Sequence, residues 1–359
     1  MASPAGGPAA ATASREVDER EIDRALIRAA QKAGGDGVWV KERRALTSGP
    51  SAAEPEPGRD RRAIEAVATP DAYQAVLSAI AAEGERQGLS VRSTDPETKG
   101  AETFEQIDVF RNRQAVDRWQ VRKVPRLYRA AIVIDDLGGD LGAAQRLLNL
   151  PYGLTFSVLP YLAHSGEVAE EAHRDGREVM LHLPMEAEPG SVLALGKGAI
   201  RIGMPAHEVA DAVAGDLASV PYVRGANNHM GSRATTDPRL MTEVMRVLAK
   251  RGLYFIDSRT TADTVAYDEA RREGVPTFFR SVFLDDKMDA AYTLQQLEAF
   301  RRIVRKHGAA LAIGHPHPTT IEALAKFLPE LEQDDVELVP PSELVRLPEV
   351  AKILPPQKQ

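Results

Sequence analysis

Three histidines lie where predicted strands end: His182 in MLHLPME, His229 in NNHMGS and His315 in AIGHPHP. Two adjacent acids, Asp135 and Asp136, end an earlier apolar run in AAIVIDDLGG. Imidazole and carboxylate groups are nitrogen and oxygen ligands of Zn²⁺-type ions, which in hydrolases keep one coordination position for water. If these strand ends converge in the fold, the residues predict a metal-assisted hydrolase.

The composition excludes several other kinds of chemistry. All eight histidines follow residue 160, so the reactive groups belong to the later part of the chain. The chain has no cysteine, which removes thiolate metal ligands, cysteine nucleophiles and disulfides. A net charge of −7 argues against a nucleic-acid partner, because binding phosphates needs a basic surface. The Arg- and Lys-rich stretch 111–129 is interpreted as solvated strands.

After Pro125 the sequence alternates between strand-like and helix-like segments. Apolar runs of strand length include AAIVI, LTFSVL, EVMLHL, LYFID and AALAIG. Helical stretches lie between most of these runs, and several of the stretches end at glycine. Continuous apolar runs are typical of parallel strands that are buried on both faces. Seven or eight such units predict a (β/α) barrel, with a doubly wound open sheet as the alternative. In both folds the reactive groups gather at the carboxyl ends of the strands.

The first third of the chain has a different organisation. Residues 1–15 are predicted to be disordered, and 16–125 contain two helices and a few strands, which indicates a small α+β domain. Within this domain, 47–61 is linker-like because it is rich in Pro, Ser and Gly. The barrel is predicted over 126–347 and a tail over 348–359. No apolar run reaches the ~18 residues that span a bilayer, and the start of the sequence does not resemble a signal peptide.

Further polar side chains follow the same strand ends. NNHMGSR surrounds its histidine with amide, hydroxyl and guanidinium groups, and FIDSRT ends another strand with an acid and a base. Loops of this composition bind ligands more often than they merely connect elements. The acid could orient a metal-binding histidine, and the guanidinium groups could bind substrate oxygens. The candidates for substrate binding or support are Asn228, Ser232, Arg233, Asp257, Arg259 and His317.

Taken in order, IVIDDLG, LHLPME, NNHMGSR, FIDSRT, VFLDD and GHPHP closely resemble the divergent polysaccharide deacetylases. That family is a branch of the NodB-homology, metal-dependent esterases, which remove N- or O-acetyl groups from sugars. The resemblance covers about residues 128–347. It implies an irregular (β/α)₇ barrel, one divalent metal ion of the Zn²⁺ type and an acetylated polysaccharide as substrate. It also implies a periplasmic or other extracytoplasmic location.

The resemblance also implies a role for each residue at the predicted site. Asp135 matches the catalytic base, Asp136 the metal-binding aspartate and His315 the general acid. The metal histidines of the wider superfamily usually lie four residues apart, whereas the residue four after His182 is a glutamate. The second histidine ligand is therefore assigned to His229 in preference to His317.

Three hypotheses follow, and they differ in the number of bound metal ions. The leading hypothesis is a hydrolase with one metal ion, in which Asn228, Ser232 and Arg233 position the sugar or stabilise the oxyanion. A catalytically inactive glycan-binding or envelope protein on the same barrel would bind no metal. A different metal-dependent amidase or phosphoesterase would favour a second ion, with His315, His317 and Asp257 as ligands.

Overall fold

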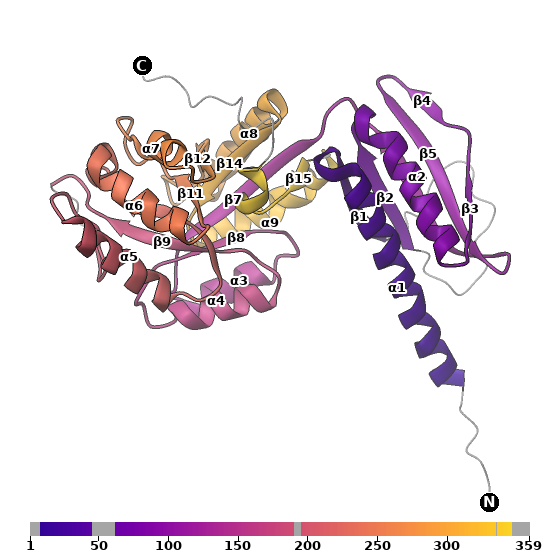
Figure 1. Ribbon diagram of the computed structural model, residues 1–359, viewed down its shortest axis with the longest axis horizontal. Helices are drawn as coiled ribbons and strands as arrows, with labels where there is room; N and C mark the ends of the chain where they lie inside the picture. Colours follow the sequence, from indigo (N-terminus) through magenta and orange to yellow (C-terminus); the bar gives the residue numbers. More distant parts are fainter. Residues whose placement is uncertain (1–7, 45–61, 190–194, 335, 347–359) are drawn as a thin grey trace, which may run out of the picture. The chain divides into compact units, whose positions relative to one another are not determined.

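The computed structural model describes residues 8–44, 62–189, 195–334 and 336–346, which form two compact units that divide after Leu127 (Figure 1). Each unit has its own core. The first helix begins at Pro8, earlier than the predicted Glu16, because the alanine-rich segment before Glu16 extends it. The predicted linker 47–61 and tail 348–359 lie outside the described residues. Among the described residues, no helix is long and apolar enough to cross a bilayer.

The first unit, Met1–Leu127, is a mixed sheet with two helices. The sheet order is β1-β2-β6-β5-β3, with β4 paired to β5, and only the β2–β6 pair is parallel. Leu26 of α1, Val76 of α2 and Trp119 of β6 are fully buried in its core. The elements are α1 Pro8–Gly34, η1 Gly35–Gly37, β1 Val38–Arg44, β2 Arg62–Ala68, α2 Pro70–Arg86, β3 Ser90–Ser93, β4 Glu97–Lys99, β5 Glu102–Arg111 and β6 Gln114–Lys123.

The second unit, Tyr128–Gln359, is a curled parallel sheet with helices packed against its outer face (Figure 1). Its strand order is β12-β11-β10-β9-β8-β7-β14-β13, and β15 also pairs with β7. The elements are β7 Tyr128–Leu137, α3 Leu141–Leu148, β8 Thr155–Val158, α4 Ser165–Arg174, β9 Val179–Met185, α5 Ala206–Ser219, β10 Val223–Met230, η2 Ala234–Thr236, α6 Pro238–Lys250, β11 Tyr254–Asp257, α7 Ala266–Arg272, β12 Thr277–Phe279, β13 Val282–Phe283, α8 Ala290–His307, β14 Ala309–Gly314, α9 Pro318–Gln333, β15 Val336–Leu338 and α10 Pro341–Leu344.

The two edge strands of this sheet follow one another directly in the chain. The amide of Arg280 donates to the carbonyl of Asp257 on β11, and the next amide, of Ser281, donates to the carbonyl of Leu311 on β14. The segment between β12 and β13 therefore steps from one edge of the sheet to the other within two residues. The curled parallel sheet is therefore that of an irregular (β/α) barrel, as predicted, and not a doubly wound open sheet.

Both faces of the barrel strands are buried, as the continuous apolar runs predict. Along β7, Ile132 and Ile134 pack with the surrounding helices, whereas Ala131 and Val133 belong to a second cluster with Met180 and other interior residues. Successive strand residues point to opposite faces, so the parity of a residue decides which of these two layers it enters. This alternation also decides which polar residues face the interior at the strand ends.

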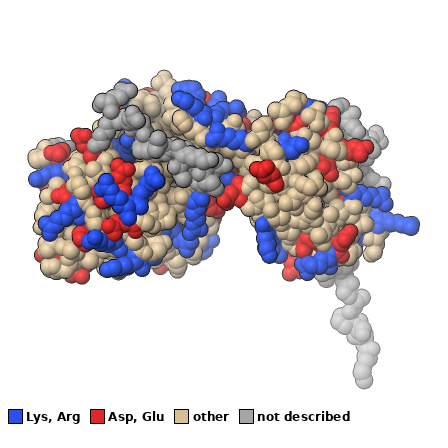
Figure 2. Space-filling view, turned by 45° about the horizontal axis from the view of Figure 1, so that its top comes forward, with Lys and Arg blue, Asp and Glu red and all other residues tan. Residues whose placement is uncertain are grey.

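The surface of each unit carries charges of both signs. Figure 2 shows Lys and Arg side chains interspersed with Asp and Glu side chains on the visible face of both units. The acidic excess of the whole chain is therefore not gathered into one patch on that face.

One buried acid on α5 links stability to pH. Asp216 is fully buried, neither of its carboxylate oxygens has a well-aligned donor among the described residues, and burial raises its pKa to about 7. Since the folded state disfavours the charged form, the free energy of unfolding should fall as pH rises from about 4 to about 7. Each pKa unit corresponds to about 1.4 kcal/mol, so the loss should be about 2–4 kcal/mol.

Replacing Asp216 with Asn should remove this part of the pH dependence. Urea unfolding at pH 5 and pH 8 measures it, with Asp211→Asn, an exposed change on the same helix, as the matched control. If the free energy of unfolding changes between pH 5 and pH 8 by the same amount in Asp216→Asn as in Asp211→Asn, Asp216 is not the source of this pH dependence.

Candidate active site

The pleat of the barrel strands brings polar side chains on or directly after six strands to the interior at one end of the barrel. Asp135 lies two residues after the interior residue Val133 on β7, so its side chain points to the same face. His182 likewise lies two residues after the interior residue Met180 on β9. The interior set at this end comprises Asp135 on β7, Ser157 on β8, His182 on β9, Asn227 and His229 on β10, and Ser258 and His315 just after β11 and β14. These are carboxyl ends of parallel strands, where barrel enzymes place their active sites.

Asp136 joins this group because the strand is interrupted there. Its φ of 58° lies in the left-handed region, and the pairing of β7 with β8 shifts register between Ile134 and Leu137. An unbroken strand would turn adjacent side chains to opposite faces. The break lets Asp135 and Asp136 both reach His182, at 3.7 Å and 3.1 Å respectively.

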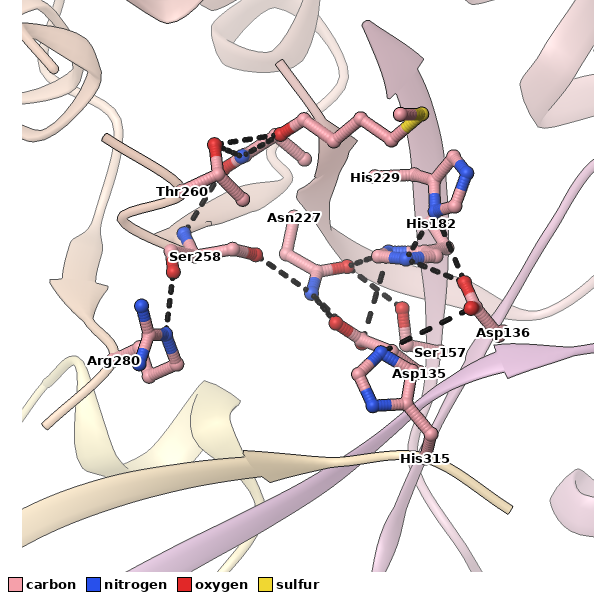
Figure 3. A network of polar contacts seen from close by, with 12 residues as sticks. Asp135, Asp136, Ser157, His182, Asn227, His229, Ser258, Thr260, Arg280 and His315 are labelled. Atoms are coloured by element: carbon pink, nitrogen blue, oxygen red, sulfur yellow. Dashed lines mark hydrogen bonds and ion pairs between the residues drawn. The ribbon is translucent and has the colours of Figure 1, made fainter. Parts of the chain in front are cut away.

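Asp136, His182 and His229 converge on one point (Figure 3). Oδ1 of Asp136 lies 3.1 Å from Nε2 of His182 and 3.0 Å from Nδ1 of His229, and the two ring nitrogens are 3.1 Å apart. Ligands of a tetrahedral zinc ion, at about 2.0–2.2 Å from the metal, lie about 3.3–3.6 Å from each other. A small outward movement of the three side chains would therefore accommodate an ion.

The hydrogen bonding of His182 directs a lone pair at this point. Nδ1 of His182 lies 3.0 Å from Oδ1 of Asn227, while the amide nitrogen of Asn227 donates to both oxygens of Asp135, at 2.8 and 3.0 Å. Because Oδ1 of Asn227 can only accept, Nδ1 of His182 carries the proton. In neutral His182 the lone pair is then on Nε2, which faces Asp136 and His229. Metal-ligating histidines are oriented in the same way, by a hydrogen bond from the ring nitrogen that does not bind the metal.

The electrostatics of the three residues favour a positive charge between them. Burial tends to raise the pKa of Asp136, but its interactions with His182 and His229 outweigh burial and lower that pKa far below its ordinary value. Burial tends to lower the pKa of His182, but Asp135 and Asp136 raise it. Oδ1 of Asp136 is buried and has no well-aligned hydrogen-bond donor among the described residues. These residues therefore fit a divalent cation in both charge and ligand type.

His315 is held beside this group by Asp285. Nδ1 of His315 lies 2.9 Å from Oδ1 of Asp285, and the amide of His315 donates to Oδ2 of the same carboxylate at 2.6 Å. This leaves Nε2 of His315 facing Asp136, 3.9 Å from Oδ2. Burial lowers the pKa of His315, but Asp285, Asp135 and Asp136 outweigh burial and raise it to about 9.

Asp257, which was expected to orient a metal-binding histidine, makes other contacts in the structure. Asp257 directly follows the interior residue Ile256 on β11, so its side chain points away from the barrel interior. Its oxygens accept from the amide of Arg259, the hydroxyl of Thr264 and the amide of Tyr267. Asp257 therefore organises the loop after β11, and Asp285 is the carboxylate that contacts His315.

A second group of possible ligands consists of Asp285, His315 and His317. Both oxygens of Asp285 are already engaged, since Thr320 also donates to Oδ2 at 2.7 Å. An ion bound here would have to displace the hydrogen bond between Asp285 and Nδ1 of His315. The set Asp136, His182 and His229 is the better cation site for this reason.

The remaining candidates lie around the site and not at its centre. Asn228 accepts from the amide of Ser258 and donates to the carbonyl of Met230. Its side chain therefore links the end of β10 to the loop after β11. Ser232 accepts from the amide of Glu188. The exposed Arg233 donates to Glu186 at 2.5 Å. Arg259 lies over the ring of Phe279, and its guanidinium carbon is 5.1 Å from the ring centre.

Several residues of the site were not among those selected from the sequence. Asn227 accepts from Ser157 at 2.7 Å and from His182, and its amide nitrogen lies 3.2 Å from Oγ of Ser258. Arg280 donates to the carbonyls of Ser258 and Arg259, which fixes the neighbouring loop. The signal that could have found Asn227 is parity, because it lies two residues before His229 on the same strand.

Replacing Asn227 with Leu should weaken metal binding by about 10–100-fold, the usual effect of losing a partner that orients a metal ligand. Leucine keeps the volume but removes the acceptor for His182 and the donor to Asp135. Zinc affinity measured by competition with a chromophoric chelator tests this. Ser157→Ala removes only one donor to Asn227 and should have a smaller effect. An unchanged affinity in a folded Asn227→Leu protein would contradict this role.

The family model described as divergent polysaccharide deacetylase matches residues 132–345. An uncharacterized protein of Haemophilus influenzae is 38% identical over 229 residues, which are 64% of this chain and 80% of the relative. The uncharacterized protein YibQ of Escherichia coli is also 38% identical over 229 residues and is covered to 71%. A crystal structure of an uncharacterized protein from Agrobacterium tumefaciens is similar at 27% identity and a TM-score of 0.59, over 61% of this chain and 89% of that one.

Proposed function

The chain belongs to the divergent polysaccharide deacetylase family, and from this premise we propose that it is a metal-dependent hydrolase. Its substrate is an envelope or extracellular polysaccharide, from which it removes N- or O-linked acetyl groups. The observation that carries the proposal is the convergence of Asp136, His182 and His229, whose ligand atoms lie 3.0–3.1 Å apart beside a fourth group, His315.

Asp136, His182 and His229 would hold one divalent ion, expected to be Zn²⁺. When bound, such an ion polarises the acetyl carbonyl and lowers the pKa of a water molecule. The hydrogen bonds of Asn227 keep Nε2 of His182 free to bind the ion and fix the carboxylate of Asp135 beside it.

Asp135 and His315 would move the protons of the reaction. Asp135 is the general base that accepts the proton of the attacking water. His315 donates from Nε2 to the departing amine or alcohol, because its Nδ1 is held by Asp285. The raised pKa of His315 keeps it protonated at neutral pH, as a general acid requires.

The sugar would be bound by residues around the metal centre. Arg233, Ser232 and Arg259 lie in the loops that follow β10 and β11. Arg233 is exposed and pairs only with the partly buried Glu186 among the described residues, so it can reach a substrate hydroxyl or acyl oxygen by leaving that pair. We place Asn228, Asp257 and His317 in supporting roles around them.

Release of acetate from N-acetylated and O-acetylated glycans tests this function. The purified protein is incubated with a panel that includes peptidoglycan fragments, chitin oligosaccharides and acetylated xylan. Acetate should appear with at least one substrate and be abolished by a chelator, then restored by Zn²⁺. If no substrate releases acetate and the protein still binds acetylated glycans without metal, the inactive glycan-binding alternative is correct.

The first unit is proposed to supply no catalytic group. None of its described residues belongs to the groups of possible metal ligands, and its histidine content is zero. Deleting residues 1–125 should therefore leave the metal affinity within about twofold of the full chain, because all the proposed ligands belong to the second unit, which has its own core. Metal titration of both proteins measures this. If circular dichroism shows that the truncated protein is folded but it no longer binds metal, the first unit does contribute to the metal site.

A further inference from the structure

A second polar pocket lies at the opposite end of the same barrel. It has a volume of about 180 Å³ and is lined by residues at the start of β10 and β11, together with residues of α10 and the turn after it. Arg224 lines it from β10, five residues before His229 on the same strand. At about 3.3 Å per residue, this separates the pocket from the candidate metal centre by about 16 Å along the strand.

The charged residues that line this pocket are all positive. Its lining includes Arg224, Arg251 and Arg346, which come from three separate segments, and it includes no acidic residue. Within the described parts of the chain, none of these three guanidinium groups takes part in an ion pair. Three like charges around one pocket repel each other, so an anion that enters gains from all three.

The wall of the pocket is fixed by buried contacts. The ring of Tyr254 lies against β10 at Gly225, where a Cβ atom would come within 2.3 Å of the ring. The Tyr254 hydroxyl donates to Glu178 at 2.7 Å, and the amide of Ser342 donates to the same oxygen at 3.0 Å. The carboxylate of Glu178, which contacts this wall, therefore already has two donors. Arg224 lies close enough to Tyr254 for its charge to act on the pKa of that hydroxyl.

We infer that this pocket binds a phosphate group, at a site distinct from the proposed hydrolytic centre. A guanidinium group offers a planar fork of donors that matches phosphate oxygens, and charge-assisted bonds of this kind are the strongest available to an exposed site. Three arginines from different segments can contact several oxygens of a tetrahedral anion at once, whereas a carboxylate offers only two. The phosphate is either free in solution or carried on a sugar.

Calorimetric titration of the full chain with inorganic phosphate tests this inference. The protein should bind one phosphate per chain, at least about tenfold more tightly than acetate at equal ionic strength. Arg224→Ala combined with Arg251→Ala should weaken binding by at least about tenfold. Arg239→Ala, which removes an exposed arginine of α6 outside the pocket, should leave it unchanged.

Further arms separate this site from the metal centre and identify the source of the phosphate. Asp136→Asn should keep phosphate binding, since the pocket lies at the other end of the barrel. Glucosamine 6-phosphate that binds more tightly than phosphate indicates a phosphorylated sugar, whereas equal affinities indicate free phosphate. The inference is overturned if the wild type shows no saturable binding, if the double variant binds as tightly as the wild type, or if Asp136→Asn abolishes binding. None of these results depends on deacetylase activity.

Discussion

Replacing Asp136 with Asn is expected to remove the bound metal and to lower the rate of acetyl hydrolysis by about 10³-fold or more. The carboxylate oxygen is the shared point of the three converging ligands, and a neutral amide loses the charge that His182 and His229 face. Polarisation of the carbonyl by a metal contributes several kcal/mol, and each 1.4 kcal/mol corresponds to about tenfold in rate.

The substitution is chosen so that the protein still folds. Asp136 has a φ of 58°, and Asn is among the few residues that adopt this left-handed conformation readily. The matched control is Asp140→Asn, on the same connection between β7 and α3, where the side chain caps α3 by accepting from the amide of Ala143. Asn caps helices about as well as Asp, so this variant should keep its metal and its rate. Equal metal content in Asp136→Asn and wild type would contradict the assignment.

Replacing His315 with Gln is expected to lower turnover on acetamides by about 10²–10⁴-fold, the usual contribution of a general acid. Metal content should stay at the wild-type level, because His315 is not assigned as a ligand. The loss on acetyl esters should be smaller, since an alcohol departs with less need of a proton than an amine does. Equal losses on both substrates would indicate a structural role for the loop that carries His315.

The pH profile gives an independent test of the same residue. Burial lowers the pKa of His315, but Asp285, Asp135 and Asp136 raise it to about 9. Because the acid must be protonated, activity should fall as pH rises through this value, and a bound cation would move the fall to lower pH. Asp285→Asn removes the carboxylate that raises this pKa, so its alkaline limb should lie at lower pH than that of the wild type. Identical alkaline limbs in the two proteins would assign the limb to another group.

The sequence was sufficient to predict the barrel and the convergence of polar residues at its strand ends, but not the pairing of the supporting residues. Runs such as AAIVIDD identify buried parallel strands, and their carboxyl ends must meet. Whether Asn227 or Asn228 enters the site depends on strand parity, and His229 has the parity of Asn227. Adjacent residues on a strand point to opposite faces. The types of residue in NNH therefore do not show which of the two asparagines faces the site.

The pairing of His315 with Asp285 depends on a feature that lies outside the local sequence. Asp285 follows the short β13, which exists because the chain steps from β11 to β14 at Arg280 and Ser281. That closure is a long-range property of the sheet, with no local pattern that predicts it. In the first unit, β2 directly follows the linker-like segment, and its pairing with β1 and β6 is likewise a property of the whole sheet.

The metal content of the purified chain is the most direct test of the proposed site. Elemental analysis after dialysis against Zn²⁺-containing and then metal-free buffer should give about one zinc ion per wild-type chain. The variants Asp136→Asn, His182→Gln and His229→Gln should each contain almost none, whereas His315→Gln and His317→Gln should contain as much as the wild type. A wild-type chain without metal, a chain with two ions, or a His315→Gln variant that has lost its ion would contradict the site described for Asp136, His182 and His229.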